Sequence, residues 1–169
     1  MQKFVLGVIV LLTICFMGCP MQTKKSIDGG SYKIPEWLVG KWVDQADTSA
    51  NPIVCRIKHD GKKTGHAIVE VLDSAGKGAE SSALIFSTVG DNIFVSAFED
   101  SNDEYDAGYY LYKFNKKSEK EIELIPLKEE IVDAKITQDS LKSWLLHNMN
   151  DSTIYDYSDI SKYSKMGKK

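Results

Sequence analysis

Short runs of alternating apolar and polar residues, separated by polar turns, fill the chain from residue 53 to residue 127. In the first run, Ile53, Cys55 and Ile57 would share one face of an extended chain, opposite Val54 and its polar neighbours. Asp60-Gly61 then gives a strong hairpin signal. Further strand-like runs occupy residues 65–72, 82–89, 93–98, 109–114 and 121–127, of which 82–89 is apolar on both faces and 109–114 is aromatic. Strands joined by such short turns pair with their sequence neighbours, which predicts an antiparallel meander.

A single segment, at about residues 137–148, has the spacing of an amphipathic helix. Thr137 is a good N-cap residue, and four apolar residues would form the buried face: Leu141, Trp144, Leu145 and Met149. Residues 152–157 are predicted to return as the last strand, and the polar tail 158–169 is predicted to be frayed. About eight strands are therefore expected, enough to close into an up-and-down barrel, so the predicted fold class is mainly β with one helix before the last strand.

The stretch that begins with Pro35 and ends with Gly40-Lys41-Trp42 precedes these strands. Trp37 and Leu38 indicate a short helical turn, and the Gly-x-Trp sequence then leads into a strand. This motif resembles the signature of the lipocalins. The resemblance implies an up-and-down barrel, and in it Trp42 is expected to fill the base of the barrel.

The first eighteen residues have the features of a secretory signal peptide, with Lys3 before the apolar run 4–17. The run ends at Gly18-Cys19, a junction that resembles the bacterial lipobox. The resemblance implies that Cys19 is lipidated, and that the protein is exported and anchored to a membrane of a bacterial cell envelope (the outer membrane or the periplasmic face). The alternative is an ordinary secreted protein with a free thiol. The whole layout resembles that of small uncharacterised envelope lipoproteins with a compact barrel.

Residues 1–18 are thus predicted to be a lipoprotein signal peptide, and residues 19–34 a lipidated cysteine followed by a flexible polar tether. Residues 35–169 are predicted to form a single β-barrel domain. With Cys19 lipidated, Cys55 would be the only remaining thiol, so no internal disulfide is expected. The net charge of −3 does not favour binding to the anionic backbone of a nucleic acid, so no nucleic-acid partner is predicted.

Metal-binding patterns in the sequence are incomplete. The acidic segment 99–106 places oxygen-bearing side chains at alternate positions, as a calcium loop does. However, Tyr105 stands where an EF-hand needs glycine, and Leu111 stands where it needs a bidentate glutamate. His59 and His66 flank one hairpin, but a zinc site needs three or four ligands. No metal site is therefore predicted.

Sequence motifs of the common enzyme classes are missing as well. The chain contains no Gly-x-Ser-x-Gly elbow, no His-Glu-x-x-His helix, no phosphate-binding loop and no dinucleotide fingerprint. We accordingly expect a non-catalytic protein that uses no cofactor.

The most aromatic run provides the candidate binding residues. Tyr110, Tyr112 and Phe114 would share one face of a strand. If that face points inward, these rings either line a ligand pocket or fill the barrel, because an eight-stranded barrel has room for one small ligand at most. Two functions follow: a lipid-anchored module that binds a small apolar ligand or a protein partner, or a structural or inhibitory envelope protein with a solid barrel that acts through its loops.

Overall fold

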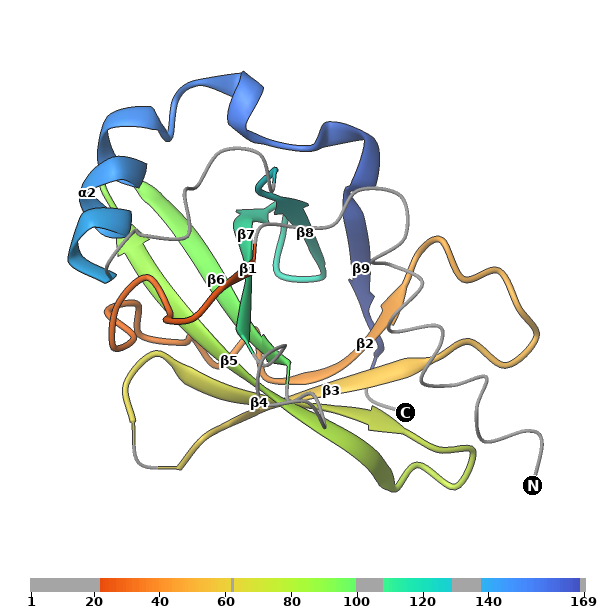
Figure 1. The fold of residues 1–169 in the computed structure, drawn as a ribbon. Helices are drawn as coiled ribbons and strands as arrows, with labels where there is room; N and C mark the ends of the chain where they lie inside the picture. Colours follow the sequence, from red (N-terminus) through yellow and green to blue (C-terminus); the bar gives the residue numbers. More distant parts are fainter. Residues whose placement is uncertain (1–21, 62, 100–107, 129–137, 168–169) are drawn as a thin grey trace.

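The computed structural model describes residues 22–61, 63–99, 108–128 and 138–167 (Figure 1). Its strands are β1 (Gln22–Thr23), β2 (Gly40–Asp44), β3 (Val54–His59), β4 (His66–Leu72), β5 (Gly78–Val89), β6 (Asn92–Glu99), β7 (Gly108–Lys116), β8 (Glu121–Pro126) and β9 (Ser161–Lys165). The helix α2 (Gln138–Asn148) and two 3₁₀ turns, η2 (Ser152–Ile154) and η3 (Tyr157–Asp159), lie between β8 and β9.

Within the described residues, eight strands close into an antiparallel barrel. Strands β2 to β7 pair in chain order, β9 pairs with both β2 and β8, and β8 pairs back with β7. The short strand β1 lies on the same edge of β7 as β8, because Tyr109 and Tyr110 of β7 pair with β1 whereas residues from Tyr112 onward pair with β8. The predicted fold class, including the single helix before the last strand, is confirmed.

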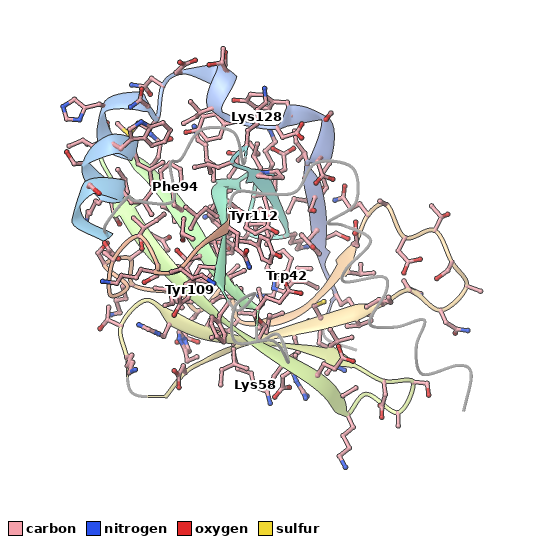
Figure 2. The ribbon with its side chains drawn as sticks, viewed as in Figure 1. Trp42, Lys58, Phe94, Tyr109, Tyr112 and Lys128 are labelled. Carbon is pink, nitrogen blue, oxygen red and sulfur yellow. The ribbon has the colours of Figure 1, made fainter. Side chains whose placement is uncertain are left out.

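Alternation along the strands explains which side chains lie inside. On β6, Val95 packs in the barrel, whereas Phe94 packs outside it beneath α2. In Figure 2, Trp42 and Tyr112 lie in the barrel and Lys58 projects away from it. Because the side-chain period of a strand is two residues, the pairing register fixes one face of every strand toward the interior.

Two apolar clusters result. The barrel core fills one end of the barrel interior with Ile34, Leu38, Trp42, Ile57, Ala67, Phe86, Val95, Phe114 and Ile122. The helix core lies outside the barrel, between α2 and the outer faces of β5 to β8, and contains Ile27, Val89, Phe94, Leu111, Ile125, Leu127, Leu141, Leu145, Ile154 and Tyr155. The predicted apolar face of the helix is thus present. The predicted N-cap, Thr137, lies outside the described residues.

The last strand differs from its predicted position. Residues 152–157, predicted to be a strand, contain η2 and the start of η3, where Asp151 and Asp156 accept hydrogen bonds from the backbone N–H groups two residues later. Such local bonds compete with strand pairing. The closing strand is instead β9, within the tail that was predicted to be frayed. Its Tyr163 packs against the barrel core, so burial of one aromatic ring favours pairing of an otherwise polar segment.

The segment 19–34 was predicted to be a flexible tether, and its described part is not one. Strand β1 pairs with β7, and Ile27 and Ile34 are only 1% and 4% exposed. Between them, Asp28 accepts hydrogen bonds from Ser87 of β5 and Lys142 of α2. The segment is polar on average, but its two isoleucines supply enough buried apolar surface to attach it to the barrel.

Candidate ligand cavity

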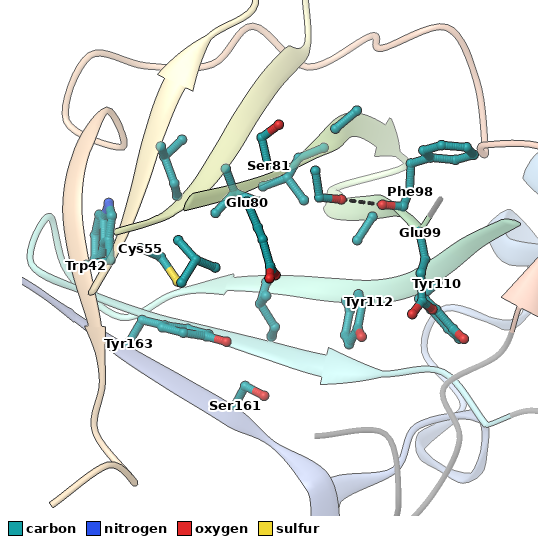
Figure 3. Close-up of a pocket in the computed structure, with 18 of the residues that line it drawn as sticks. Trp42, Cys55, Glu80, Ser81, Phe98, Glu99, Tyr110, Tyr112, Ser161 and Tyr163 are labelled. Atoms are coloured by element: carbon teal, nitrogen blue, oxygen red, sulfur yellow. Dashed lines mark hydrogen bonds between the residues drawn. The ribbon is translucent and has the colours of Figure 1, made fainter. Parts of the chain in front are cut away.

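The end of the barrel interior opposite the barrel core holds a cavity of about 470 Å³ (Figure 3). Its wall is mostly apolar, with hydroxyl, thiol and carboxyl groups added at a few points. The lining residues are Trp42, Cys55, Ile57, Val69, Val71, Glu80, Ser81, Ser82, Ala83, Leu84, Ala97, Phe98, Glu99, Tyr110, Tyr112, Ile122, Leu124, Ser161 and Tyr163.

Trp42 forms part of the floor and is 1% exposed. Its indole N–H donates a 2.8 Å hydrogen bond to the carbonyl oxygen of Leu38, which satisfies the polar atom of the buried ring. The prediction that Trp42 fills the base of the barrel agrees with this position. Because the donor and its acceptor are only four residues apart, the turn before β2 and the ring that follows it form one local unit.

Aromatic rings close the barrel below the floor. Phe86 and Phe114 meet edge to face with their centroids 5.7 Å apart, and Trp37 lies 6.4 Å from Phe114. Lys165 of β9 donates a hydrogen bond to the carbonyl oxygen of Trp37 and so fastens the turn across the end of the barrel. We call this end the closed end.

At the opposite end, which we call the open end, no segment of the described residues crosses the barrel. Glu80 on β5, Glu99 on β6 and Tyr110 on β7 line the cavity near the ends of their strands that lie away from the floor. Glu80 is exposed to solvent, whereas Trp42 on the floor is buried. A ligand would therefore enter between these strand ends.

The structure separates the three predicted binding residues. Tyr110 and Tyr112 line the cavity. Phe114 is 5% exposed, belongs to the barrel core and is not part of the lining. All three share one face of β7, as predicted, and the structure shows that this face points inward. Each lies at a different depth along the barrel axis, and the cavity ends above Phe114.

Several lining residues were not predicted, and Tyr163 is the clearest of them. It was not predicted because it lies in a polar tail. In β9, Ser161, Tyr163 and Lys165 share one face of the strand. Burial raises the pKa of the Tyr163 hydroxyl far above its ordinary value, and the nearby Asp44 carboxylate adds to the effect. Tyr163 is therefore a neutral hydroxyl in the wall.

Cys55 provides the thiol of the wall, on β3. Burial raises the pKa of this thiol, and the nearby Asp44 carboxylate raises it further. The thiol is consequently neutral near pH 7 and contributes to the wall as a small apolar group.

The remaining predicted sites are not brought together. His59 contacts Glu36 at 3.1 Å, and His66 contacts the carbonyl oxygen of Gly29 at 3.0 Å. In the part of the chain that the structure describes, no three His, Cys, Asp or Glu side chains gather as a metal site would require. Cys19 and residues 100–106 of the acidic segment lie outside that part.

No helix among the described residues has the length and apolar character needed to cross a membrane. The sequence matches no known family model and no curated protein, and the fold matches no solved structure. The cavity is therefore interpreted from its own geometry.

Proposed function

We propose that this protein is a lipid-anchored, non-catalytic protein of the bacterial cell envelope that binds a small apolar ligand inside its barrel. The observation that carries the proposal is the cavity of about 470 Å³. Small-molecule sites typically have volumes of ~300–1,000 Å³ and combine mostly apolar walls with a few polar groups that orient the ligand. This cavity has both properties. It lies inside an up-and-down barrel, which is the architecture that the resemblance to lipocalins implies.

The alternative of a solid barrel that acts through its loops receives less support. A solid interior would place side chains against Tyr112 and Val71, where the structure has open space. Empty apolar volume of this size lowers stability because the lining atoms lose packing contacts. A binding role gives a reason for a protein to keep such a space.

The N-terminal part of the proposal rests on the apolar run that ends at Gly18-Cys19. A lipid on Cys19 would hold the protein at the membrane surface. Cys19 precedes Gln22 of β1 by three positions, so at most ~11 Å of chain would separate the lipidated residue from the barrel. The barrel would lie close to the membrane instead of at the end of a long tether.

Binding can be tested with N-phenyl-1-naphthylamine, a neutral apolar dye whose fluorescence rises in apolar surroundings. We expect saturable binding of one dye per chain. Ala97→Trp places a ring in the cavity wall and should abolish binding. Ile68→Trp adds a ring to β4, on the outward face between Ala67 and Val69, and should leave binding unchanged. Equal binding by both variants would place the dye elsewhere and reject the cavity as the site.

Anchoring can be tested separately by mass spectrometry of the membrane fraction. We expect an acylated N-terminal peptide that begins at Cys19, and we expect Cys19→Ala to release the protein from the membranes. Cys15→Ala is the matched control and should leave the protein acylated. A Cys19→Ala protein that stays on the membranes would contradict the proposed anchor.

A further inference from the structure

We infer that the cavity selects ligands that carry a positively charged head group on an apolar body, such as an alkylamine or a quaternary alkylammonium. The inference rests on the proposed function, because it names the ligand class of the same cavity.

The charged side chains that the structure describes in the wall have one sign. Glu80 and Glu99 line the cavity, and the described lining contains no Lys, Arg or His. In Figure 3, Glu80 reaches into the cavity toward the space between Tyr163 and Tyr112, and the carboxylate of Glu99 lies beside Tyr110. Both carboxylates thus face the space that a ligand would fill.

Two carboxylates elsewhere in the protein are paired with cations. Glu70 is held by Arg56 at 2.7 Å and by Lys58 at 2.6 Å, and Asp28 is held by Lys142 at 2.7 Å. Glu80 and Glu99 have no ion pair among the described residues. A cation in the cavity would supply the missing partner.

Two lysine ammonium groups lie beside aromatic rings at the closed end of the barrel. The ammonium group of Lys116 lies 4.4 Å from the ring centroid of Trp37, and that of Lys165 lies 5.7 Å from the ring centroid of Trp42. These two cations lie at the closed end, whereas the carboxylates of the described lining, Glu80 and Glu99, lie toward the open end. This arrangement would orient a cationic amphiphile with its head group toward the opening and its apolar tail toward the floor.

The wall beside the carboxylates also suits a cation. Rings of Tyr110, Tyr112 and Tyr163 border the space that Glu80 and Glu99 face (Figure 3). A quaternary ammonium is stabilised by aromatic faces as well as by anions. A carboxylate ligand would find no cationic partner among the described residues of this wall, and removing it from water without one is unfavourable.

The test compares three ligands of nearly equal alkyl length that carry different head groups: decyltrimethylammonium, decan-1-ol and decanoate. Calorimetry on the full-length chain carrying Cys19→Ala, which removes the proposed acylation site, gives the three dissociation constants. We expect decyltrimethylammonium to bind at least tenfold more tightly than decanoate, with decan-1-ol between them.

Neutralising the two carboxylates should remove the preference. In the double variant Glu80→Gln/Glu99→Gln, the ratio of the dissociation constants of decanoate and decyltrimethylammonium should fall toward one. The dissociation constant of decan-1-ol should stay within about twofold of its value in the wild type. The control is Asp91→Asn/Glu121→Gln, which removes the same net charge from exposed positions at the closed end and should keep the preference.

The outcomes separate the two proposals. Binding of decan-1-ol with no preference for the ammonium over the carboxylate overturns the charge selection and leaves the apolar binding function standing. A preference that persists in the double Glu→Gln variant also overturns it. Failure of all three ligands to bind overturns both proposals.

Discussion

The two halves of the barrel interior are built from the same strands but differ in packing. At the closed end, Phe86, Phe114 and Trp37 pack together beneath the floor. At the open end, the same strands contribute Glu80 and Tyr112 to a cavity of about 470 Å³. The difference arises because a separate segment, residues 34–38, crosses the closed end and fills it, whereas no described segment fills the open end. A barrel can thus be stabilised by one half and keep the other half for a ligand.

The difference in packing between the two halves can be tested with a pair of substitutions on β7. Phe114 and Tyr112 share the inward face of this strand two residues apart, one in each half. Phe114→Ala should lower the free energy of unfolding by ~3–5 kcal/mol, because it leaves a hole in a packed core. Tyr112→Ala should cost less than about half of that, because one side of its ring already faces empty space. Urea unfolding gives both values, and equal losses would mean that the open half is packed as well.

The floor between the two halves can be tested through Trp42. Trp42→Ala should lower the free energy of unfolding by ~3–5 kcal/mol, as expected for removal of a buried indole. Trp42→Phe should retain most of the stability, because it keeps an aromatic ring and loses the hydrogen bond to Leu38. A loss below ~1 kcal/mol for the alanine variant would show that the floor does not contribute to the core.

Acid should loosen the attachment of the segment that leads to the closed end. Burial raises the pKa of the Asp28 carboxyl, but hydrogen bonds from Lys142, Ser87, Ser31 and Gly30 outweigh burial and lower that pKa far below its ordinary value. A pKa that is lower in the folded state adds stability above the unfolded pKa of ~3.9, and that stability is lost as the pH falls.

We therefore expect the melting temperature to fall between about pH 5 and pH 2. Asp28→Asn should be less stable than the wild type at pH 7 and should lose less stability over that range. Asp91→Asn changes an exposed carboxylate near the same end and should follow the wild type. Identical pH profiles for Asp28→Asn and the wild type would show that this carboxylate does not fasten the segment.

The reaction rate of the Cys55 thiol reports whether the open half of the barrel is occupied, and the expected change in this rate is modest. In a chain carrying Cys15→Ser and Cys19→Ser, Cys55 is the single thiol. Because its pKa is raised by burial and by Asp44, its reaction with iodoacetamide should keep accelerating above pH 8.5. Saturating decan-1-ol should slow the reaction severalfold by filling the space beside the thiol. An unchanged rate would mean that the ligand binds outside the cavity.

The sequence predicted the barrel because alternation and turn chemistry are local signals, readable in residues 53–127. It also placed Tyr110, Tyr112 and Phe114 on one face of a strand, since the period of a strand determines which residues share a face. Depth along the barrel axis depends on what fills each end, and for this reason Phe114 proved to be a core residue. Closure by β9 depends on Tyr163, and attachment of the N-terminal segment depends on Ile27 and Ile34. Single apolar residues in polar surroundings give no periodic signal.

The central claim, that the open half of the barrel accepts a ligand, is tested most directly by a crystal structure of the protein soaked with 10-bromodecan-1-ol. We expect one anomalous bromine peak per chain inside the barrel, within the wall formed by Tyr112, Val71 and Cys55, and no such peak in Ala97→Trp. Bromine peaks only on the outer surface, or an interior that repacks to leave no space for the alkyl chain, would contradict it.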